Sequence, residues 1–217
     1  MADKYPNFEV LSRHETAGLD YRILARGARR AFAIVAPHGG GIEPGTSELA
    51  DAIGGQELSY YAFEGLKRSG NGGLHITSTR FDEPVCLALV AQSAVVVTIH
   101  GEDSDAPGEG VFLGGLDDEL GPCVGRALRA AGFVVRRHPD PELQGREPDN
   151  LCNRGTSRKG VQLELSRTVR AEMFSSLSRE GRKCKTARFY DFVEAVRGVL
   201  DRHLPALAPR RKRAMAG

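Results

Sequence analysis

The sequence predicts an α/β fold, a three-layer α/β/α sandwich around a mixed, largely parallel sheet. Apolar runs typical of strands alternate with segments typical of helices along most of the chain. Two of the apolar runs, residues 32–36 and 94–99, are continuous stretches of aliphatic and β-branched side chains. Such runs indicate strands that are buried on both faces, as in the centre of a parallel sheet.

The other elements follow from local patterns. Residues 21–26 alternate polar and apolar side chains, which predicts a half-buried strand, antiparallel at an edge of the sheet. Residues 116–131 carry apolar side chains at helical spacing, which predicts an amphipathic helix. Further strands are expected at residues 58–63, 74–79, 111–113, 133–136 and 161–166, and further helices at residues 46–53, 85–93 and 186–203.

Length and composition indicate one globular domain. The chain has 217 residues, of which 41% are hydrophobic and 27% are charged. We expect residues 1–205 to form a single domain and residues 206–217 to be a basic, disordered tail. The net charge of +2 is too small to favour nucleic acid as a partner.

The sequence also gives an expectation for the cellular location of the protein. It has neither an apolar segment near the N-terminus nor a run near twenty apolar residues, so we expect no signal peptide and no membrane span. The four cysteines are widely separated, and none belongs to a Cys-x-x-Cys pair, which argues against a zinc ribbon or a redox motif. Reduced thiols are therefore expected, as in a cytoplasmic protein.

Metal-ligating residue types follow the two buried strands. The first run is followed by His38, three glycines and Glu43, and the second by His100 and a glycine. If the strands are neighbours, their carboxyl ends bring both imidazoles and the carboxylate to one edge of the sheet. Two histidines and one carboxylate form the three-ligand set of a catalytic zinc site. The alternative is a tight glycine turn beside which His38 is incidental.

Five short segments in this order resemble a known family. They are residues 38–43, 74–78, 99–101, 150–155 and 163–166, within a likeness that covers roughly residues 20–200. The chain resembles the phage-type poly-gamma-glutamate hydrolase family, compact relatives of the zinc carboxypeptidases. The resemblance implies a zinc-carboxypeptidase-like mixed sheet between helices, one zinc ion per chain and a glutamate that acts as base.

The resemblance also assigns roles to single residues. It implies that His38, Glu43 and His100 hold zinc, and that Glu164 is the general base. Glu164 would take a proton from water and return it to the leaving nitrogen. The implied substrate-binding residues are Arg154, Asn150, Asn153 and His75.

Each of these assignments has a structural alternative. Glu164 also fits the solvated face of an alternating strand, and His75 also fits a partly buried histidine with its hydrogen bonds satisfied. Arg154 lies in a long loop, residues 139–160, and an arginine there can hold the loop through backbone carbonyls. Arg167 and Arg170 either attract a polyanion or belong to the start of a helix.

The leading functional hypothesis is a zinc-dependent hydrolase that cleaves gamma-glutamyl amide bonds in poly-gamma-glutamate, a polyanionic polymer. A second hypothesis keeps this chemistry but takes peptidoglycan peptides or an acyl amino acid as substrate. A third, from another class, is a non-enzymic phage-related protein whose basic tail binds nucleic acid.

Overall fold

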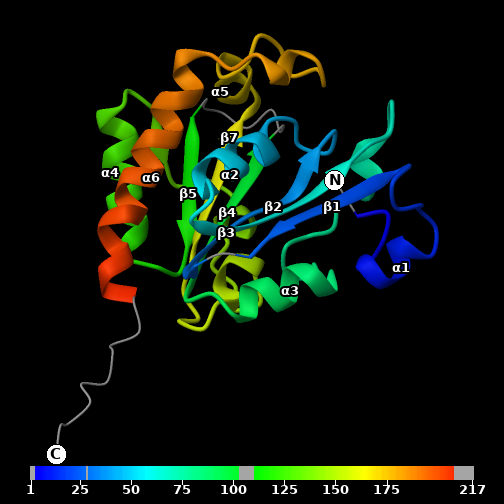
Figure 1. Cartoon of the computed structure of the whole chain (residues 1–217), viewed down its shortest axis with the longest axis horizontal. Coiled ribbons are helices and arrows are strands. Elements are labelled where there is room, and N and C mark those ends of the chain that lie inside the picture. Colours follow the sequence, from blue (N-terminus) through cyan, green and yellow to red (C-terminus); the bar gives the residue numbers. More distant parts are fainter. Residues whose placement is uncertain (1–2, 28, 103–109, 208–217) are drawn as a thin grey trace, which may run out of the picture.

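The computed structural model describes residues 3–27, 29–102 and 110–207, which form one seven-stranded sheet with helices on both faces (Figure 1). The sheet order is β1-β3-β2-β4-β7-β5-β6. The strands are β1 (Tyr21–Arg26), β2 (Arg29–Gly40), β3 (Leu58–Gly65), β4 (Val95–Glu102), β5 (Val111–Gly115), β6 (Val135–Arg136) and β7 (Val161–Ser166).

The sheet is mixed and largely parallel, as the sequence predicts. Strands β3, β2, β4 and β7 run parallel in its centre. Strand β1 is an antiparallel edge strand beside β3, and β5 runs antiparallel to β7. The carboxyl ends of β2, β4 and β7 therefore lie at one edge of the sheet, where ligand sites of α/β proteins form.

Two apolar cores make the three layers. On one face α2, α4 and α6 cover Phe32 and Ile34 of β2, and on the other face α1 and α3 cover Ala33 and Val35. Since successive strand residues point to opposite faces, β2 is buried on both sides, which confirms the interpretation of the apolar run. The helices are α1 (Phe8–Ser12), α2 (Thr46–Gly54), α3 (Pro84–Ala91), α4 (Leu120–Ala130), α5 (Arg167–Glu172) and α6 (Ala187–Leu207).

One extra residue in β2 changes the face to which its end points. Ala36 pairs with Ala62 and Gly39 with Glu64, so β2 advances three residues while β3 advances two. This is a β-bulge, and Pro37 lies within it, where a missing N–H is tolerated. Strict alternation would place His38 on the face of Ile34, but the bulge moves it to the face covered by α1 and α3.

Several predicted elements differ in the structure. Residues 74–79 do not form a strand, because only a 3₁₀ turn, Asn71–Leu74, and irregular chain lie there. The long loop contains two 3₁₀ turns, Pro141–Gln144 and Leu151–Arg154. The last helix continues to Leu207, beyond the expected domain boundary, so the predicted tail is helical at its start. Residues 208–217 of that tail lie outside the described residues.

The cysteines and the helices also relate to what the sequence predicts. All four cysteines are free, as expected for reduced thiols. In the described part of the chain, no helix combines the length and the apolar character that crossing a bilayer requires.

The turn that follows the bulge gives a testable prediction. Gly40 has a φ of 66°, and a Cβ there would lie 2.6 Å from the carbonyl oxygen of Gly65. We expect Gly40→Ala to lower the free energy of unfolding by about 3 kcal/mol, because backbone strain and a clash with main-chain atoms add together. Urea unfolding measures the change.

Gly18→Ala is the matched control. Gly18 has a φ of 83°, but nothing lies within 4 Å of a Cβ built there. Only the left-handed strain of about 1 kcal/mol should remain. Equal losses in the two variants would contradict the close approach of β2 to β3.

Candidate functional site

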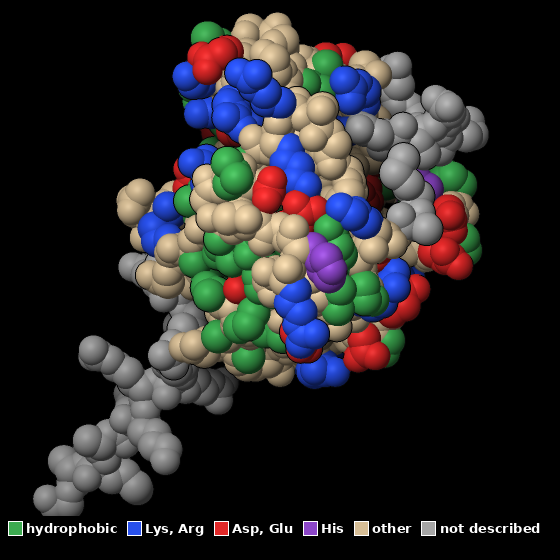
Figure 2. Space-filling model, turned by 90° about the vertical axis from the view of Figure 1, so that its right-hand side faces the viewer, with side chains coloured by type: hydrophobic (Ala, Val, Ile, Leu, Met, Phe, Trp, Pro, Cys, Tyr) green, Lys and Arg blue, Asp and Glu red, His purple; other side chains and the backbone are tan. Residues whose placement is uncertain are grey.

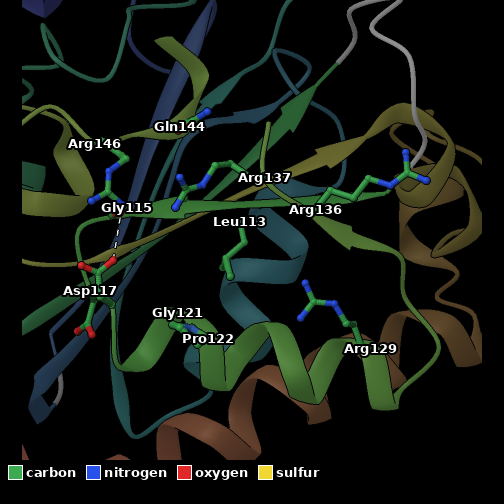
Figure 3. A pocket seen from close by; sticks show the side chains of 12 residues that line it. Leu113, Gly115, Asp117, Gly121, Pro122, Arg129, Arg136, Arg137, Gln144 and Arg146 are labelled. Carbon is green, nitrogen blue, oxygen red and sulfur yellow. Dashed lines mark hydrogen bonds and ion pairs between the residues drawn. The ribbon is translucent and has the colours of Figure 1, made fainter. Parts of the chain in front are cut away.

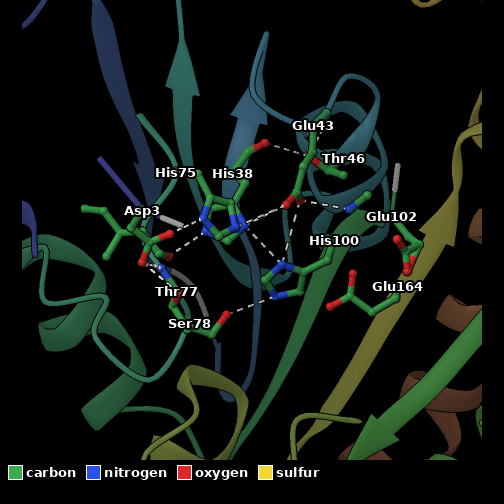
Figure 4. A network of polar contacts seen from close by, with 12 residues as sticks. Asp3, His38, Glu43, Thr46, His75, Thr77, Ser78, His100, Glu102 and Glu164 are labelled. Atoms are coloured by element: carbon green, nitrogen blue, oxygen red, sulfur yellow. Dashed lines mark hydrogen bonds and ion pairs between the residues drawn. The ribbon is translucent and has the colours of Figure 1, made fainter. Parts of the chain in front are cut away.

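The predicted zinc ligands and the predicted base meet where β2, β4 and β7 end (Figure 4). His38 lies on β2 just after the bulge, and Glu43 lies in the loop between β2 and α2. His100 on β4 is the register partner of Glu164 on β7, so both side chains start from neighbouring positions on one face. All four residues are buried.

Main-chain hydrogen bonds fix the position of Glu43. Its backbone N–H donates to the carbonyl of His38 at 2.8 Å, and its carboxylate Oε2 accepts from the backbone N–H of Gly101 at 2.8 Å. The second bond ties the loop after β2 to the end of β4. Gly101 has to be a glycine, because a Cβ there would lie 2.6 Å from the guanidinium carbon of Arg170.

Donor atoms of three residues converge at this point, namely one ring nitrogen of each histidine and both carboxylate oxygens of Glu43. His38 Nδ1 lies 2.9 Å from Glu43 Oε1 and 3.2 Å from His100 Nδ1, and His100 Nδ1 lies 3.7 Å from Glu43 Oε2. Ligands about 2.0–2.1 Å from a tetrahedral zinc ion lie about 3.3 Å from one another. The separations therefore fit one zinc ion held by His38, Glu43 and His100.

The outer nitrogens of both rings support this interpretation. His38 Nε2 lies 2.8 Å from the carbonyl oxygen of Ile76, which only accepts, so Nε2 carries the proton. In the neutral ring, Nδ1 then presents a lone pair to the carboxylate of Glu43. His100 Nε2 lies 3.4 Å from the Ser78 hydroxyl, and its Nδ1 also faces inward. Electron pairs that converge in this way require either a proton or a cation between them. The contacts of the two Nε2 atoms with Ile76 and Ser78 are of the kind that orients metal-ligating histidines.

His75 provides an alternative third ligand. Donor atoms of His38, Glu43 and His75 all lie within 4.8 Å of one another. His75 Nδ1 contacts Asp3 Oδ1 at 2.7 Å, which leaves Nε2 directed at Glu43 Oε1, 3.9 Å away. The separations in the set with His100 are shorter and closer to the tetrahedral value. The His75 side chain is also 34% exposed, whereas that of His100 is 4% exposed.

The surroundings give the two carboxylates different proton affinities. Without a cation, Glu43 raises the pKa of His38 although burial opposes its charge, and the protonated His38 lowers the pKa of Glu43 to about 2 although burial opposes that charge too. Burial lowers the pKa of His100 to about 3. Burial, together with the charges of Glu43 and Glu102, raises the pKa of Glu164 well above its ordinary value. An ionised Glu43 and a neutral His100 are the forms that bind metal.

A relay of amides holds Glu164. Gln162 Nε2 donates to Glu164 Oε1 at 3.0 Å, and Asn150 Nδ2 donates to Gln162 Oε1 at 3.1 Å. Asn150, to which the resemblance assigns a substrate contact, therefore supports Glu164 through Gln162 in this structure. Its direct contact with substrate stays a prediction.

Asn153 and Arg154 hold the long loop. Asn153 is fully buried and donates to the carbonyls of Gly145 and Glu147. The Arg154 guanidinium donates to three carbonyls, those of Thr79, Phe81 and Asp149, at 2.7–2.9 Å. These contacts correspond to the alternative in which an arginine fixes the loop, and substrate binding by either residue stays a prediction.

Two further residues support the site, and of these Asp3 was not identified from the sequence. Asp3 contacts His75 and also accepts from the backbone N–H and the hydroxyl of Thr77 at 2.8 and 2.7 Å. Arg170 is fully buried and donates to the carbonyls of Leu165, Pro44 and Glu102. The suggestion that Arg170 attracts a polyanion is therefore wrong, because its guanidinium lies inside the protein and braces the strand ends.

The charged surface is mixed on the side that carries α1. Figure 2 shows Lys and Arg side chains next to Asp and Glu over much of this face, with a gathering of Lys and Arg at its top. This agrees with the net charge of +2. A polyanionic ligand would therefore need local basic groups.

Comparison with known proteins places the chain in a family. The family model for poly-gamma-glutamate hydrolase matches residues 5–195. Two Bacillus subtilis proteins are similar. The SPbeta prophage-derived protein YoqZ is 38% identical over 95% of this chain and 75% of its own length, and YndL is 36% identical over 89% and 76%.

Two solved structures are also similar, each at 35% sequence identity. A bacteriophage poly-gamma-glutamate hydrolase superimposes with a TM-score of 0.89 over 94% of this chain and 100% of its own. A zinc-free, apo form of YndL superimposes with a TM-score of 0.83 over 92% and 98%. The chain is therefore a hydrolase that belongs to the poly-gamma-glutamate hydrolase family.

Proposed function

We propose that this chain hydrolyses gamma-glutamyl amide bonds of poly-gamma-glutamate, with one zinc ion held by His38, Glu43 and His100. The observation that carries the metal assignment is the convergence of the Nδ1 atoms of two imidazoles and one carboxylate at separations of 2.9–3.7 Å. That YndL was solved in a form described as zinc-free supports zinc as the metal. The family membership supports the substrate class.

In the proposed reaction, the metal ion and the carboxylate of Glu164 have separate tasks. When bound, zinc supplies a lowered pKa for water and polarises the scissile carbonyl. Glu164 accepts a proton from the attacking water and delivers it to the nitrogen of the leaving amine. The amide bond breaks in this step, and its two products are a carboxylic acid and an amine. Gln162 holds one oxygen of Glu164, which fixes the direction of proton transfer.

The substrate assignment is tested with polymers that differ only in linkage. The purified protein with zinc should shorten poly-gamma-glutamate and leave alpha-linked polyglutamate intact, as measured by size-exclusion chromatography. A gamma-linked peptidoglycan peptide in the same series tests the second hypothesis. Failure to shorten poly-gamma-glutamate with zinc present would contradict the proposed substrate.

The third zinc ligand is tested by comparing two histidine variants. We expect His100→Ala to lose bound zinc on dialysis, because it removes one of three ligands. His75→Ala should retain zinc with an affinity at most about 10–100-fold weaker, the effect of removing a supporting partner. Zinc content is measured by elemental analysis after gel filtration.

The opposite result would assign the metal differently. If His75→Ala loses zinc and His100→Ala retains it, the ligand set is His38, Glu43 and His75. Circular dichroism of both variants serves as the control for folding.

We expect Glu164→Gln to lower the activity of the protein and to raise its stability. We expect kcat to fall roughly 10²–10⁴-fold, the usual contribution of a general base, with zinc content unchanged. In chelator the variant should melt at a higher temperature than the parent at pH 8. The raised pKa of Glu164 means that ionisation costs the folded state stability, and this cost grows as the pH rises above the ordinary pKa of about 4.3.

The difference in melting temperature should vanish near pH 4, where the parent carboxyl is protonated as well. Glu142→Gln is the matched control, since Glu142 is exposed. An equal gain in stability in the control, or full activity in Glu164→Gln, would contradict the role assigned to Glu164.

A further inference from the structure

The irregular segment that begins at His75 ends in an arginine that the proposed reaction does not use. The side chain of Arg80 is 52% exposed, and its Nη2 donates to Asp3 Oδ2 at 2.7 Å. The same nitrogen lies 3.3 Å from the hydroxyl oxygen of Thr77. Arg80 is therefore held at the surface by two residues that belong to the support of the candidate site.

Contacts between side chains connect Arg80 to the reaction centre. Asp3 Oδ1 lies 2.7 Å from His75 Nδ1, and His75 Nε2 lies 3.9 Å from Glu43 Oε1. Figure 4 shows the His75 ring between Asp3 and Glu43. The path from Glu43 Oε1 along these contacts to Arg80 Nη2 is about 14 Å long, which sets an upper limit on their separation.

The exposed fractions of the side chains indicate where the site is open. The side chains of His38 and His100 are 2% and 4% exposed, and that of Glu43 is 11% exposed. The side chain of His75 is 34% exposed. Of these four residues, His75 is the one that solvent reaches most readily, so the site is open on the side where Asp3 holds this ring.

Most N–H groups of Arg80 are available to a ligand. Its Nη2 serves Asp3 and Thr77, whereas the three N–H groups on Nε and Nη1 make no hydrogen bond with any residue that the structure describes. Asp3 has other partners, because its carboxylate also accepts from His75 Nδ1 and from the backbone N–H and the hydroxyl of Thr77. Arg80 can therefore contact a second carboxylate while it stays bound to Asp3.

Other arginines are less well placed for a ligand of this site. The guanidinium groups of Arg154 and Arg170 are used by backbone carbonyls. A group of exposed arginines surrounds a hollow of about 190 Å³ beside β5 and α4 (Figure 3). Helix α4 covers the face of the sheet opposite to that of His100 and Glu164, so this hollow does not open into the site.

The proposed substrate carries the group that an exposed arginine binds. Every residue of poly-gamma-glutamate has a free alpha-carboxylate, and a guanidinium matches a carboxylate in charge and shape. An extended gamma-linked residue spans roughly 6 Å, so the upper limit of about 14 Å between Glu43 and Arg80 corresponds to about two residues. A chain whose scissile carbonyl lies at the metal site can therefore place an alpha-carboxylate of a nearby residue at Arg80.

We propose that Arg80 binds an alpha-carboxylate of the substrate within about two residues of the bond being cut, while Asp3 holds its guanidinium in place. This inference rests on the proposed function and deepens it, because it names a residue that recognises the substrate. It makes the free alpha-carboxylate a determinant of binding.

The first test measures turnover. We expect Arg80→Gln to raise KM for poly-gamma-glutamate about tenfold with kcat unchanged, because one charge-assisted contact with the substrate is lost. Zinc content, measured by elemental analysis, should equal that of the parent, since Asp3 keeps its contacts with His75 and Thr77.

The second test asks whether the contact is made to the alpha-carboxylate. Two fluorescently labelled gamma-glutamate oligomers are compared, one with free alpha-carboxylates and one with alpha-carboxamides. Their Kd values are measured by anisotropy on zinc-loaded Glu164→Gln protein, in which turnover is slow. Adding Arg80→Gln should weaken binding of the first oligomer about tenfold and leave the Kd of the second unchanged.

Two further variants serve as controls. Arg13→Gln also removes an exposed arginine that is paired with a carboxylate, that of Glu9, and should leave KM as in the parent. Arg80→Lys keeps a positive charge beside Asp3 but loses the planar fork, and should give an intermediate KM.

The possible results separate the inference from the proposed function. If the parent shortens the polymer and Arg80→Gln keeps its KM, the inference is overturned while the proposed function stands. If Arg80→Gln weakens the binding of both oligomers equally, or loses zinc, Arg80 acts by holding Asp3 and His75, and the inference is also overturned. A parent that neither binds nor shortens the polymer overturns the proposed function itself.

Discussion

The extra residue in β2 is the constraint on which the candidate metal site depends. Without it, the alternation of the strand would direct His38 into the core under α2 and α6, with Phe32 and Ile34. With it, His38 lies on the same face as His100, whose Nδ1 is 3.2 Å from its own. A bulge beside a site re-aims one side chain and leaves the rest of the strand paired, so the apolar core on both faces of β2 is kept.

The irregular segment from His75 to Ser78 has a function of its own. The carbonyl of Ile76 accepts from His38, the backbone N–H of Thr77 donates to Asp3, and the Ser78 hydroxyl contacts His100. In a strand, the Ile76 carbonyl and the Thr77 N–H would be used by a neighbouring strand. Here they orient the side chains of the site, which explains why a segment with strand-like composition is not a strand.

The sequence predicted most of the fold because the local pattern of polar and apolar residues indicates most of the helices and strands. Residues 161–166 form β7 at the predicted bounds, since alternation marks both the strand and its faces. The second apolar run continues to Glu102, because its end pairs with β7, and this pairing cannot be read from the run itself. Asp3 could not be found either: it reaches His75 across 72 positions, and an aspartate in a polar N-terminal stretch carries no pattern. Local patterns report which face a residue occupies, whereas its partner depends on the tertiary fold.

Glu43 and Glu164 lie in one buried site, yet their surroundings drive their pKa values apart. Burial raises both, but Glu43 faces His38 and its pKa falls to about 2, whereas Glu164 faces the charges of Glu43 and Glu102 and its pKa rises. Such a separation distinguishes a permanent anion from a group that exchanges protons. A carboxylate that binds a metal ion must stay ionised, whereas a carboxylate that acts as general base must be able to hold the proton that it accepts. A divalent cation beside Glu164 would favour its ionised form before the reaction, so an ion held at Glu43 as proposed would also prepare Glu164 to accept a proton.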